Sequence, residues 1–182
     1  MAEGWKDGWR AFHRGVQVGR LWVGPPWEEP PGDATTVVID PGRAFGTGAH
    51  ATTRLCLELL QDVEPTSLLD VGCGSGVLSV AAAKLGFAPV TGVDIDEVSL
   101  EVTSGNAAAN GVSVEVGTEL GPAELAVMNI ALDVVERMLP QLPVERAITS
   151  GYLERDEPHV EGWHRLERRV RDGWAADLLE RT

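Results

Sequence analysis

The chain has 182 residues, of which 43% are hydrophobic and 24% are charged, and its formal net charge is −13. This length suffices for one well-buried domain and falls short of two full ones. No apolar run approaches the roughly 18 residues that a membrane span requires. The acidic balance argues against direct nucleic-acid binding, because phosphate binding requires a basic surface.

The only cysteines are Cys56 and Cys73. Their separation does not match a metal-ligand spacing such as CxxC, so we expect no metal site there. The chain also opens without a basic and then apolar leader. Two reduced thiols in a cytoplasmic protein are the expected state.

The N-terminal stretch differs from the rest of the chain. "EGWKDGWRAFHRG" predicts a short helix that carries Trp5, Trp9 and Phe12 as one aromatic stripe. "GRLWVGPPWEEPPGD" follows, with a short strand and a connector that prolines interrupt. The aromatic faces of Trp5, Trp9 and Trp22 have no evident partner in the sequence, and we expect them to seat against another surface.

The next segment, "TVVID", predicts a strand that leads into the glycine-dense loop "DPGRAFGTGAHATT", residues 40–53. The loop contains no lysine, so it does not match the GxxxxGK[ST] loop that binds nucleotide phosphates. "HATTRLCLELLQDV" then predicts a helix with Leu55, Leu59 and Leu60 on its apolar side. The loop is of a kind that binds ligands, and the rest of the chain has to indicate which one.

The strongest motif is "SLLDVGCGSGVLSVAAAKLG", an apolar strand followed by a glycine turn and an alanine-rich helix. Gly72, Gly74 and Gly76 allow the backbone to turn sharply and to approach a ligand closely. Their GxGxG spacing differs from the GxGxxG of dinucleotide-binding proteins, and alone it also fits a purely structural turn. Asp94 ends the next strand, where a carboxylate accepts hydrogen bonds from both hydroxyls of a ribose. Together, these residues predict a ligand that contains a nucleoside.

These motifs resemble a known family. "LLDVGCGSGVLSVAAAKLG" and "VTGVDIDEVSLEVTSGNAAANGV" resemble the class I methyltransferases that use S-adenosylmethionine. "IDPGRAFGTGAHATTRLCLELL" narrows the resemblance to the bacterial methyltransferases of ribosomal large-subunit protein eleven, the PrmA family. "MNIALDVVERMLPQL", "SGYL" and "DGWAADLLER" resemble later segments of that family in the same order. Family members carry a recognition domain before the tryptophan-rich connector, and we expect this chain to lack it.

The resemblance implies S-adenosylmethionine as the cofactor and assigns residues to it. Thr53, at the start of the helix after the loop, would lie against the cofactor. Gly72 and Gly74 would lie under the chain that bears the sulfonium, with Asp70 holding the turn and Asp94 binding the ribose.

Further residues would complete the pocket. Phe45, Thr47 and His50 would cover the methyl group, and Thr118 and Glu119 fall where this fold contacts adenine. His50 has two interpretations: it is a general base, or it is a hydrogen-bonded structural group, which is the commoner role of a lone loop histidine.

Asn129, which the resemblance places beside the cofactor's methyl group, is the candidate catalytic residue and also a cofactor contact. It ends the strand "AELAVMN", at the carboxyl edge of the sheet where ligands bind in this fold. A lysine with a pKa of about 10.4 must lose a proton before it attacks, which costs about 4.6 kcal/mol at pH 7. A carboxylate would raise that cost by stabilising the ammonium, whereas a neutral amide oxygen orients the amine with less penalty. The alternative is that Asn129 only caps the following helix.

Late in the chain, "RLERRVRDG" predicts an antiparallel strand with a solvated basic face. A substrate-binding role for Arg168, Arg169 and Arg171 is the alternative interpretation. Trp163 and Trp174 are expected to fill the edge of the sheet.

We therefore expect an α/β fold of the class I methyltransferase, Rossmann-like type. Its seven-stranded sheet would be mostly parallel with an antiparallel late strand, and helices would cover both faces. Residues 1–34 would form the N-terminal helix and connector, and residues 35–182 the methyltransferase domain. The expected function is transfer of methyl groups from S-adenosylmethionine to amino groups of a basic protein, in the first place ribosomal protein eleven. The alternatives are another protein lysine or small amine as acceptor, and an inactive protein that binds the cofactor.

Overall fold

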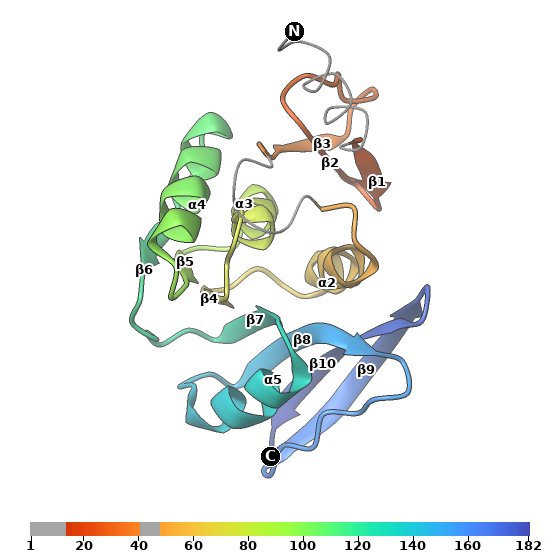
Figure 1. Ribbon diagram of the computed structural model, residues 1–182, viewed down its shortest axis with the longest axis vertical. Coiled ribbons are helices and arrows are strands. Elements are labelled where there is room, and N and C mark those ends of the chain that lie inside the picture. Colours follow the sequence, from red (N-terminus) through yellow and green to blue (C-terminus); the bar gives the residue numbers. More distant parts are fainter. Residues whose placement is uncertain (1–13, 41–47) are drawn as a thin grey trace, which may run out of the picture.

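The computed structural model describes residues 14–40 and 48–182 (Figure 1). Its main element is a seven-stranded sheet with the order β6-β5-β4-β7-β8-β10-β9. The strands are β4 (Leu68–Val71), β5 (Val90–Val93), β6 (Glu115–Gly117), β7 (Leu125–Asn129), β8 (Arg146–Leu153), β9 (Trp163–Arg171) and β10 (Trp174–Arg181). Six strands run in one direction, and the terminal strand β10 runs antiparallel to both of its neighbours. This topology confirms the predicted fold class.

Helices cover both faces of this sheet (Figure 1). One face carries α2 (Ala51–Asp62), α3 (Val77–Lys84) and α4 (Glu97–Ala109), and the other carries α5 (Leu132–Met138) and the short 3-10 helix η1 (Leu139–Gln141). Side chains of β7 alternate between the two cores: Leu125 and Val127 join the first, and Ala126 and Met128 join the second. A central parallel strand is buried on both faces, which explains its continuous apolar sequence. In residues 14–40 and 48–182, no helix is long and apolar enough to cross a membrane.

A second, three-stranded sheet packs on the α2 and α3 side. It consists of β1 (Val16–Val18), β2 (Leu21–Gly24) and β3 (Thr35–Val38). The central strand β2 pairs antiparallel with β1 and parallel with β3. Its apolar side chains join the same core as α2 and α3. The predicted boundary between residues 34 and 35 falls between β2 and β3, two strands that pair with each other.

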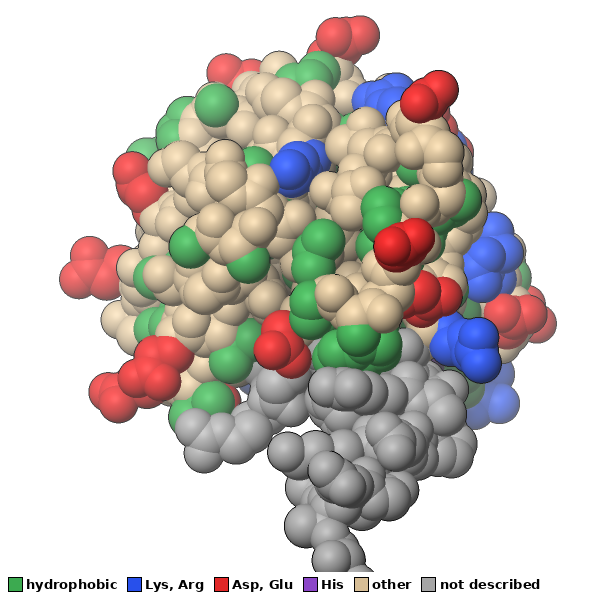
Figure 2. Space-filling model, turned by 90° about the horizontal axis from the view of Figure 1, so that it is seen from above, with side chains coloured by type: hydrophobic (Ala, Val, Ile, Leu, Met, Phe, Trp, Pro, Cys, Tyr) green, Lys and Arg blue, Asp and Glu red, His purple; other side chains and the backbone are tan. Residues whose placement is uncertain are grey.

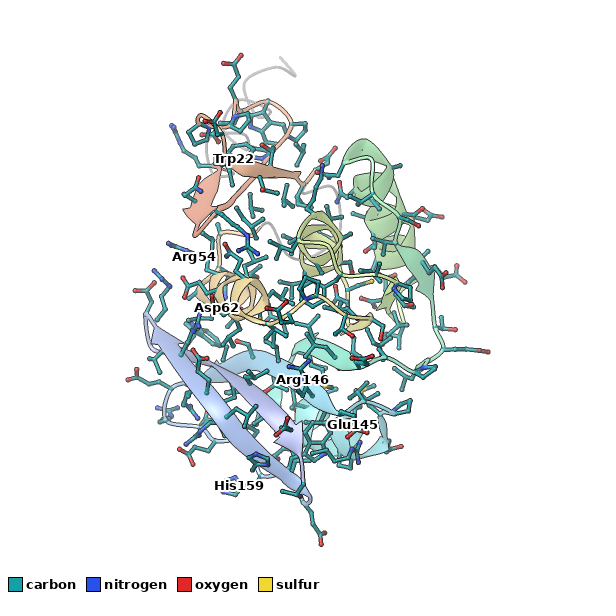
Figure 3. All side chains as sticks on the ribbon, turned by 180° about the vertical axis from the view of Figure 1, so that it is seen from behind. Trp22, Arg54, Asp62, Glu145, Arg146 and His159 are labelled. Atoms are coloured by element: carbon teal, nitrogen blue, oxygen red, sulfur yellow. The ribbon has the colours of Figure 1, made fainter. Side chains whose placement is uncertain are left out.

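Trp22 belongs to the interior of this small sheet (Figure 3). Only 4% of its surface is exposed, and its ring covers Gly15 and Gly24, where a Cβ atom would overlap the ring. The expectation that Trp22 lacks a partner is therefore wrong, because Gly15 and Gly24, on either side of it in the sequence, make room for its ring. Trp5 and Trp9 lie outside the described residues.

The arginines of β9 have structural partners. Arg168 donates to the carbonyls of Glu154 and Asp156 at 2.9 and 2.6 Å and pairs with the buried Asp177. Its side chain is only 15% exposed, so it is not part of a solvated face. The other two arginines reach α2, where Arg169 pairs with Asp62 and Arg171 with Glu58, at 2.5 and 2.6 Å. Asp62 lies on α2 above these strands in Figure 3.

The two late tryptophans pack on opposite cores, Trp174 on the α2 and α3 side and Trp163 on the α5 side. Trp163 starts the edge strand β9, and the guanidinium of Arg181 lies 4.8 Å from the centre of its ring.

Candidate functional site

The polar residues singled out in the sequence come from neighbouring strand ends. Gly72 and Gly74 follow β4, Asp94 follows β5, and Asn129 is the last residue of β7. Because β5, β4 and β7 are parallel neighbours, their carboxyl ends meet at one edge of the sheet. Thr53 in the first turn of α2 reaches the same edge, since its hydroxyl lies 3.2 Å from the amide nitrogen of Asn129.

The glycine turn is built around left-handed backbone conformations. Gly72, Gly74 and Gly76 have φ values of 77°, 54° and 78°, which side chains with a Cβ rarely adopt. The N–H of Gly74 donates to Oδ2 of Asp94 at 3.0 Å, and the N–H of Asp96 donates to Oδ1 at 3.0 Å. The turn therefore holds the Asp94 carboxylate in a fixed orientation. Both oxygens retain lone pairs for a further donor, because a carboxylate accepts about four hydrogen bonds.

Asp70 lies beneath this turn and is buried. Its Oδ2 accepts a hydrogen bond from the Ser79 hydroxyl at 2.5 Å, which ties β4 to the first turn of α3. Burial raises the pKa of Asp70 to about 6; the bonds from Ser79 lower it, and the nearby charge of Asp94 raises it further. Asp70 thus ties the two ends of the turn together, although burial disfavours its charged form.

Thr53 and Asn129 form the second half of the site. Nδ2 of Asn129 donates to Oγ1 of Thr53. This bond orients the amide, so that Oδ1 is its remaining acceptor; no hydrogen bond to Oδ1 comes from residues 14–40 or 48–182. Asn129 is not the N-cap of the following helix, a position that Ala131 occupies. The interpretation of Asn129 as only a helix cap is therefore wrong.

Ile130, the next residue, is enclosed by two glycines. A Cβ atom on Gly72 would lie 2.7 Å from Cγ2 of Ile130, and one on Gly151 would overlap the carbonyl oxygen of Ile130. Gly151 has φ 103°, and the N–H of Ile130 donates to the Ser150 carbonyl at 3.1 Å. The backbone after Asn129 is thus held from β8 and from the glycine turn together.

His50 caps α2. Its ring nitrogen Nδ1 lies 3.4 Å from the N–H of Thr52 and 2.8 Å from the Thr52 hydroxyl, and its ring meets Trp174 edge-on, with the ring centres 4.9 Å apart. These contacts are those of a structural N-cap. Phe45 and Thr47 lie outside the described residues.

The purine side of the predicted pocket lies at the ends of β5 and β6. The N–H of Asp94 donates to the Gly117 carbonyl at 3.3 Å, so Thr118 and Glu119 follow directly beside Asp94. Ile95, directly after Asp94, is 100% exposed.

Sequence reasoning overlooked the polar side of α4. The hydroxyl of Thr103 donates to the Gly74 carbonyl at 3.0 Å, and the amide of Asn106 donates to the Ser75 carbonyl at 2.8 Å. The available signal was the spacing of Thr103, Asn106 and Asn110 at three and four residues, which places all three on one helix face. Across the described part of the chain, no group of three or more His, Cys, Asp or Glu side chains is arranged to hold a metal ion.

Comparison with known proteins agrees with this architecture. A family model described as ribosomal protein L11 methyltransferase (PrmA) matches residues 1–177. The ribosomal protein L11 methyltransferase of Symbiobacterium thermophilum is 39% identical, over 97% of this chain and 65% of its own length. That of Pelobacter propionicus is 38% identical, over 99% of this chain and 62% of its own length. The chain thus spans less than two thirds of the length of these curated relatives.

A solved structure described as ribosomal protein L11 methylase from Lactobacillus delbrueckii subsp. bulgaricus has the same fold. It superposes with a TM-score of 0.82 at 28% sequence identity, covering 93% of this chain and 99% of that one. The family match extends over nearly the whole chain, and the glycine turn, the loop before α2 and the end of β7 all fall inside it. This chain belongs to the ribosomal protein L11 methyltransferase (PrmA) family.

Proposed function

We propose that this chain transfers methyl groups from S-adenosylmethionine to amino groups of ribosomal protein eleven, in the cytoplasm. The acceptor amines are lysine side chains or the N-terminal amine. The observation that carries the proposal is the hydrogen bond between Thr53 and Asn129, which leaves an amide oxygen as acceptor at the end of β7. Family membership supports the protein acceptor.

The backbone and the polar groups of the site suit S-adenosylmethionine. Cys73 and Ser75 of the turn are buried, and Gly74 carries no side chain, so a ligand can approach the backbone there. Asp94 is held by Gly74 and keeps acceptor capacity for the two ribose hydroxyls. Ile95 offers an exposed apolar surface on which a purine ring can pack. When bound, S-adenosylmethionine supplies an electrophilic methyl group, and the electron pair of the broken C–S bond stays on sulfur.

Asn129 would act on the acceptor. Its Oδ1 accepts a hydrogen bond from an N–H of the incoming amine and so aims the nitrogen lone pair. The amide is neutral, so it does not stabilise the ammonium form, whose deprotonation already costs a lysine about 4.6 kcal/mol at pH 7. Much of the rate would come from positioning, since an attacking atom held at about 3–3.5 Å reacts far faster than one free in solution.

Thr53 would direct this process by holding the amide rotamer. Without the Thr53 hydroxyl, the amide can turn and present its NH2 group to the acceptor, and an NH2 group cannot accept a hydrogen bond from an amine. A buried hydroxyl at this position is therefore a requirement of the mechanism as well as of packing.

The test uses purified ribosomal protein eleven and cofactor labelled in its methyl group. The acceptor is raised to saturation, so that kcat is read separately from acceptor capture. We expect label in the acceptor with the wild-type chain, at least tenfold lower kcat for Thr53→Val, and near-normal kcat for Thr53→Ser, which keeps the hydroxyl. For Asn129→Ala, kcat should fall much more than the affinity for the product S-adenosylhomocysteine.

Three outcomes would change the proposal. Label that appears only in other proteins of a ribosomal extract would indicate a different acceptor. Product binding without any methyl transfer would indicate an inactive cofactor-binding protein. If rate and product affinity fall together in Asn129→Ala, Asn129 is a cofactor contact without a role in turnover.

A further inference from the structure

Two asparagines, Asn106 in α4 and Asn110 at its C-cap, hold the end of β3. They are buried, with 4% of Asn106 and 9% of Asn110 exposed. Oδ1 of Asn110 accepts from the N–H of Val38 at 2.8 Å, and its Nδ2 donates to the Val38 carbonyl at 2.6 Å. Oδ1 of Asn106 accepts from the N–H of Asp40 at 3.1 Å, and its Nδ2 donates to the Asp40 carbonyl at 3.4 Å. Each side-chain amide therefore takes the place of a peptide group in a neighbouring strand.

Helix and strand geometry explain why this pairing works. Four residues of an α-helix rise about 6 Å, and two residues of a strand rise about 6.6 Å. Asn106 and Asn110 can therefore meet Asp40 and Val38 in register. Ile39 lies between Val38 and Asp40, and its N–H points away from α4 and donates to the Gly24 carbonyl of β2 at 2.8 Å. The end of β3 is thus bonded on both sides.

Only one of the two asparagines also reaches the glycine turn. Nδ2 of Asn106 donates to the Ser75 carbonyl at 2.8 Å, and the neighbouring Thr103 donates to the Gly74 carbonyl at 3.0 Å. A Cβ atom on Gly76 would lie 2.8 Å from Thr103, so the turn packs directly on α4. Because the C=O and N–H of a planar trans peptide point in opposite directions, these two bonds fix the orientation of the turn's peptide groups.

We propose that Asn106 is a positioning residue of the cofactor site, which locks the glycine turn to the end of β3. Its single amide bonds to Asp40 and to Ser75, two segments that are otherwise separated by α2, β4 and the turn itself. The turn is thereby held in its ligand-binding conformation before the ligand arrives. This inference rests on the proposed use of S-adenosylmethionine.

The experiment compares Asn106→Ala with Asn110→Ala in the full chain. Both variants remove a buried amide that pairs with β3, so both should lower the urea midpoint of unfolding. Only Asn106→Ala removes the bond to Ser75, so only it should weaken binding of S-adenosylhomocysteine in calorimetry, by about tenfold. Thr103→Val, which removes the bond to Gly74, should weaken binding of S-adenosylhomocysteine as Asn106→Ala does.

Equal affinities of Asn106→Ala and Asn110→Ala for the product would overturn the inference. If the wild-type chain itself does not bind the product, the proposed cofactor is wrong and the role of Asn106 falls with it; the two failures are therefore distinguishable. If Asn106→Ala does not fold, hydrogen exchange of the wild-type chain tests the coupling between the turn and β3 instead. Bound product should slow exchange of the Asp40 amide, held by Asn106, at least fivefold more than that of the Val38 amide, held by Asn110. An equal effect on both amides would refute the coupling.

Discussion

Two aspartates at the glycine turn show how surroundings decide the role of the same side chain. Asp94 is partly exposed, and the N–H groups of Gly74 and Asp96 hold its carboxylate. Asp70 is buried beneath the turn and has the Ser79 hydroxyl as its partner. We propose the first as a ligand-binding group, whereas the second ties β4 to α3.

For Asp94 we expect that Asp94→Asn weakens binding of S-adenosylhomocysteine by roughly 10- to 150-fold, because hydrogen bonds to a charged group contribute about 1.5–3 kcal/mol. Calorimetry measures the change. Asp96→Asn is the matched control: it removes the same charge two residues away, and asparagine remains a good N-cap for α4. A similar loss of affinity in both variants would indicate a general charge effect and remove Asp94 from the ribose role.

For Asp70 we expect a pH-dependent gain in stability on substitution by asparagine. Its pKa is raised from 3.8 to about 6, so the folded protein disfavours the carboxylate. The stability contribution of Asp70 is fully present below pH 3.8 and is lost as the pH rises through about 6. Between pH 4 and pH 7, Asp70→Asn should gain about 2 kcal/mol relative to the wild type, from about 1.36 kcal/mol per pKa unit.

Urea unfolding at several pH values measures this difference. Ser79→Ala should extend the loss of stability to higher pH, because it removes a hydrogen bond that lowers the pKa of Asp70. A difference between Asp70→Asn and the wild type that stays constant across this range would contradict the prediction.

At the scale of elements, the site depends on where strand β7 stops. Asn129 is still paired with Ser150 of β8, and the chain then passes between Gly72 and Gly151. Gly151 leaves space for the backbone of Ile130 and Gly72 for its side chain, so the two glycines fix the chain directly after Asn129.

Gly151→Ala should therefore lower kcat at least tenfold while leaving affinity for S-adenosylhomocysteine within about twofold, because a shift of about 1 Å in a positioned group can cost a hundredfold in rate. Gly173→Ala is the control. It carries the same strain of a positive φ, 79°, but a Cβ atom there would have no atom of the described structure within 4 Å. Equal kcat in the two alanine variants would show that Ile130 does not position Asn129.

At the scale of the whole molecule, one apolar core joins the small sheet to the large one. Leu21, Val37 and Ile39 of the small sheet belong to the same buried cluster as Leu55 of α2 and Leu125 of β7. Charged groups are distributed unevenly around this core. In Figure 2 acidic side chains extend around most of the visible outline, and basic ones gather mainly on one side.

Because the core is shared, we expect the two sheets to unfold together. In native-state hydrogen exchange with added urea, the amides of Ile39 and Leu125, which bond to Gly24 and Ser67, should converge on the same free energy of opening. They should also show the same dependence on urea. Exchange of Ile39 through a smaller opening that urea hardly changes would show that the small sheet opens independently.

The sequence by itself determined the class I fold and the residues that meet at the edge of the sheet. Alternating apolar strands and helices predict a parallel sheet, and parallel strands bring their carboxyl ends together wherever the loops run. Glycines at Gly72 and Gly74, followed by an acid at Asp94, are local signals, because backbone conformation and strand position follow from residue type and spacing. The PrmA-like motifs are local for the same reason.

The tertiary structure alone decided which groups bond across the sequence. The hydrogen bond from Asn129 to Thr53 and that from Asn106 to Ser75 join segments that no periodicity relates. Such contacts depend on how whole elements pack. From sequence alone, a polar side chain on a helix is expected to face solvent, and only the packing shows that a backbone carbonyl lies opposite it.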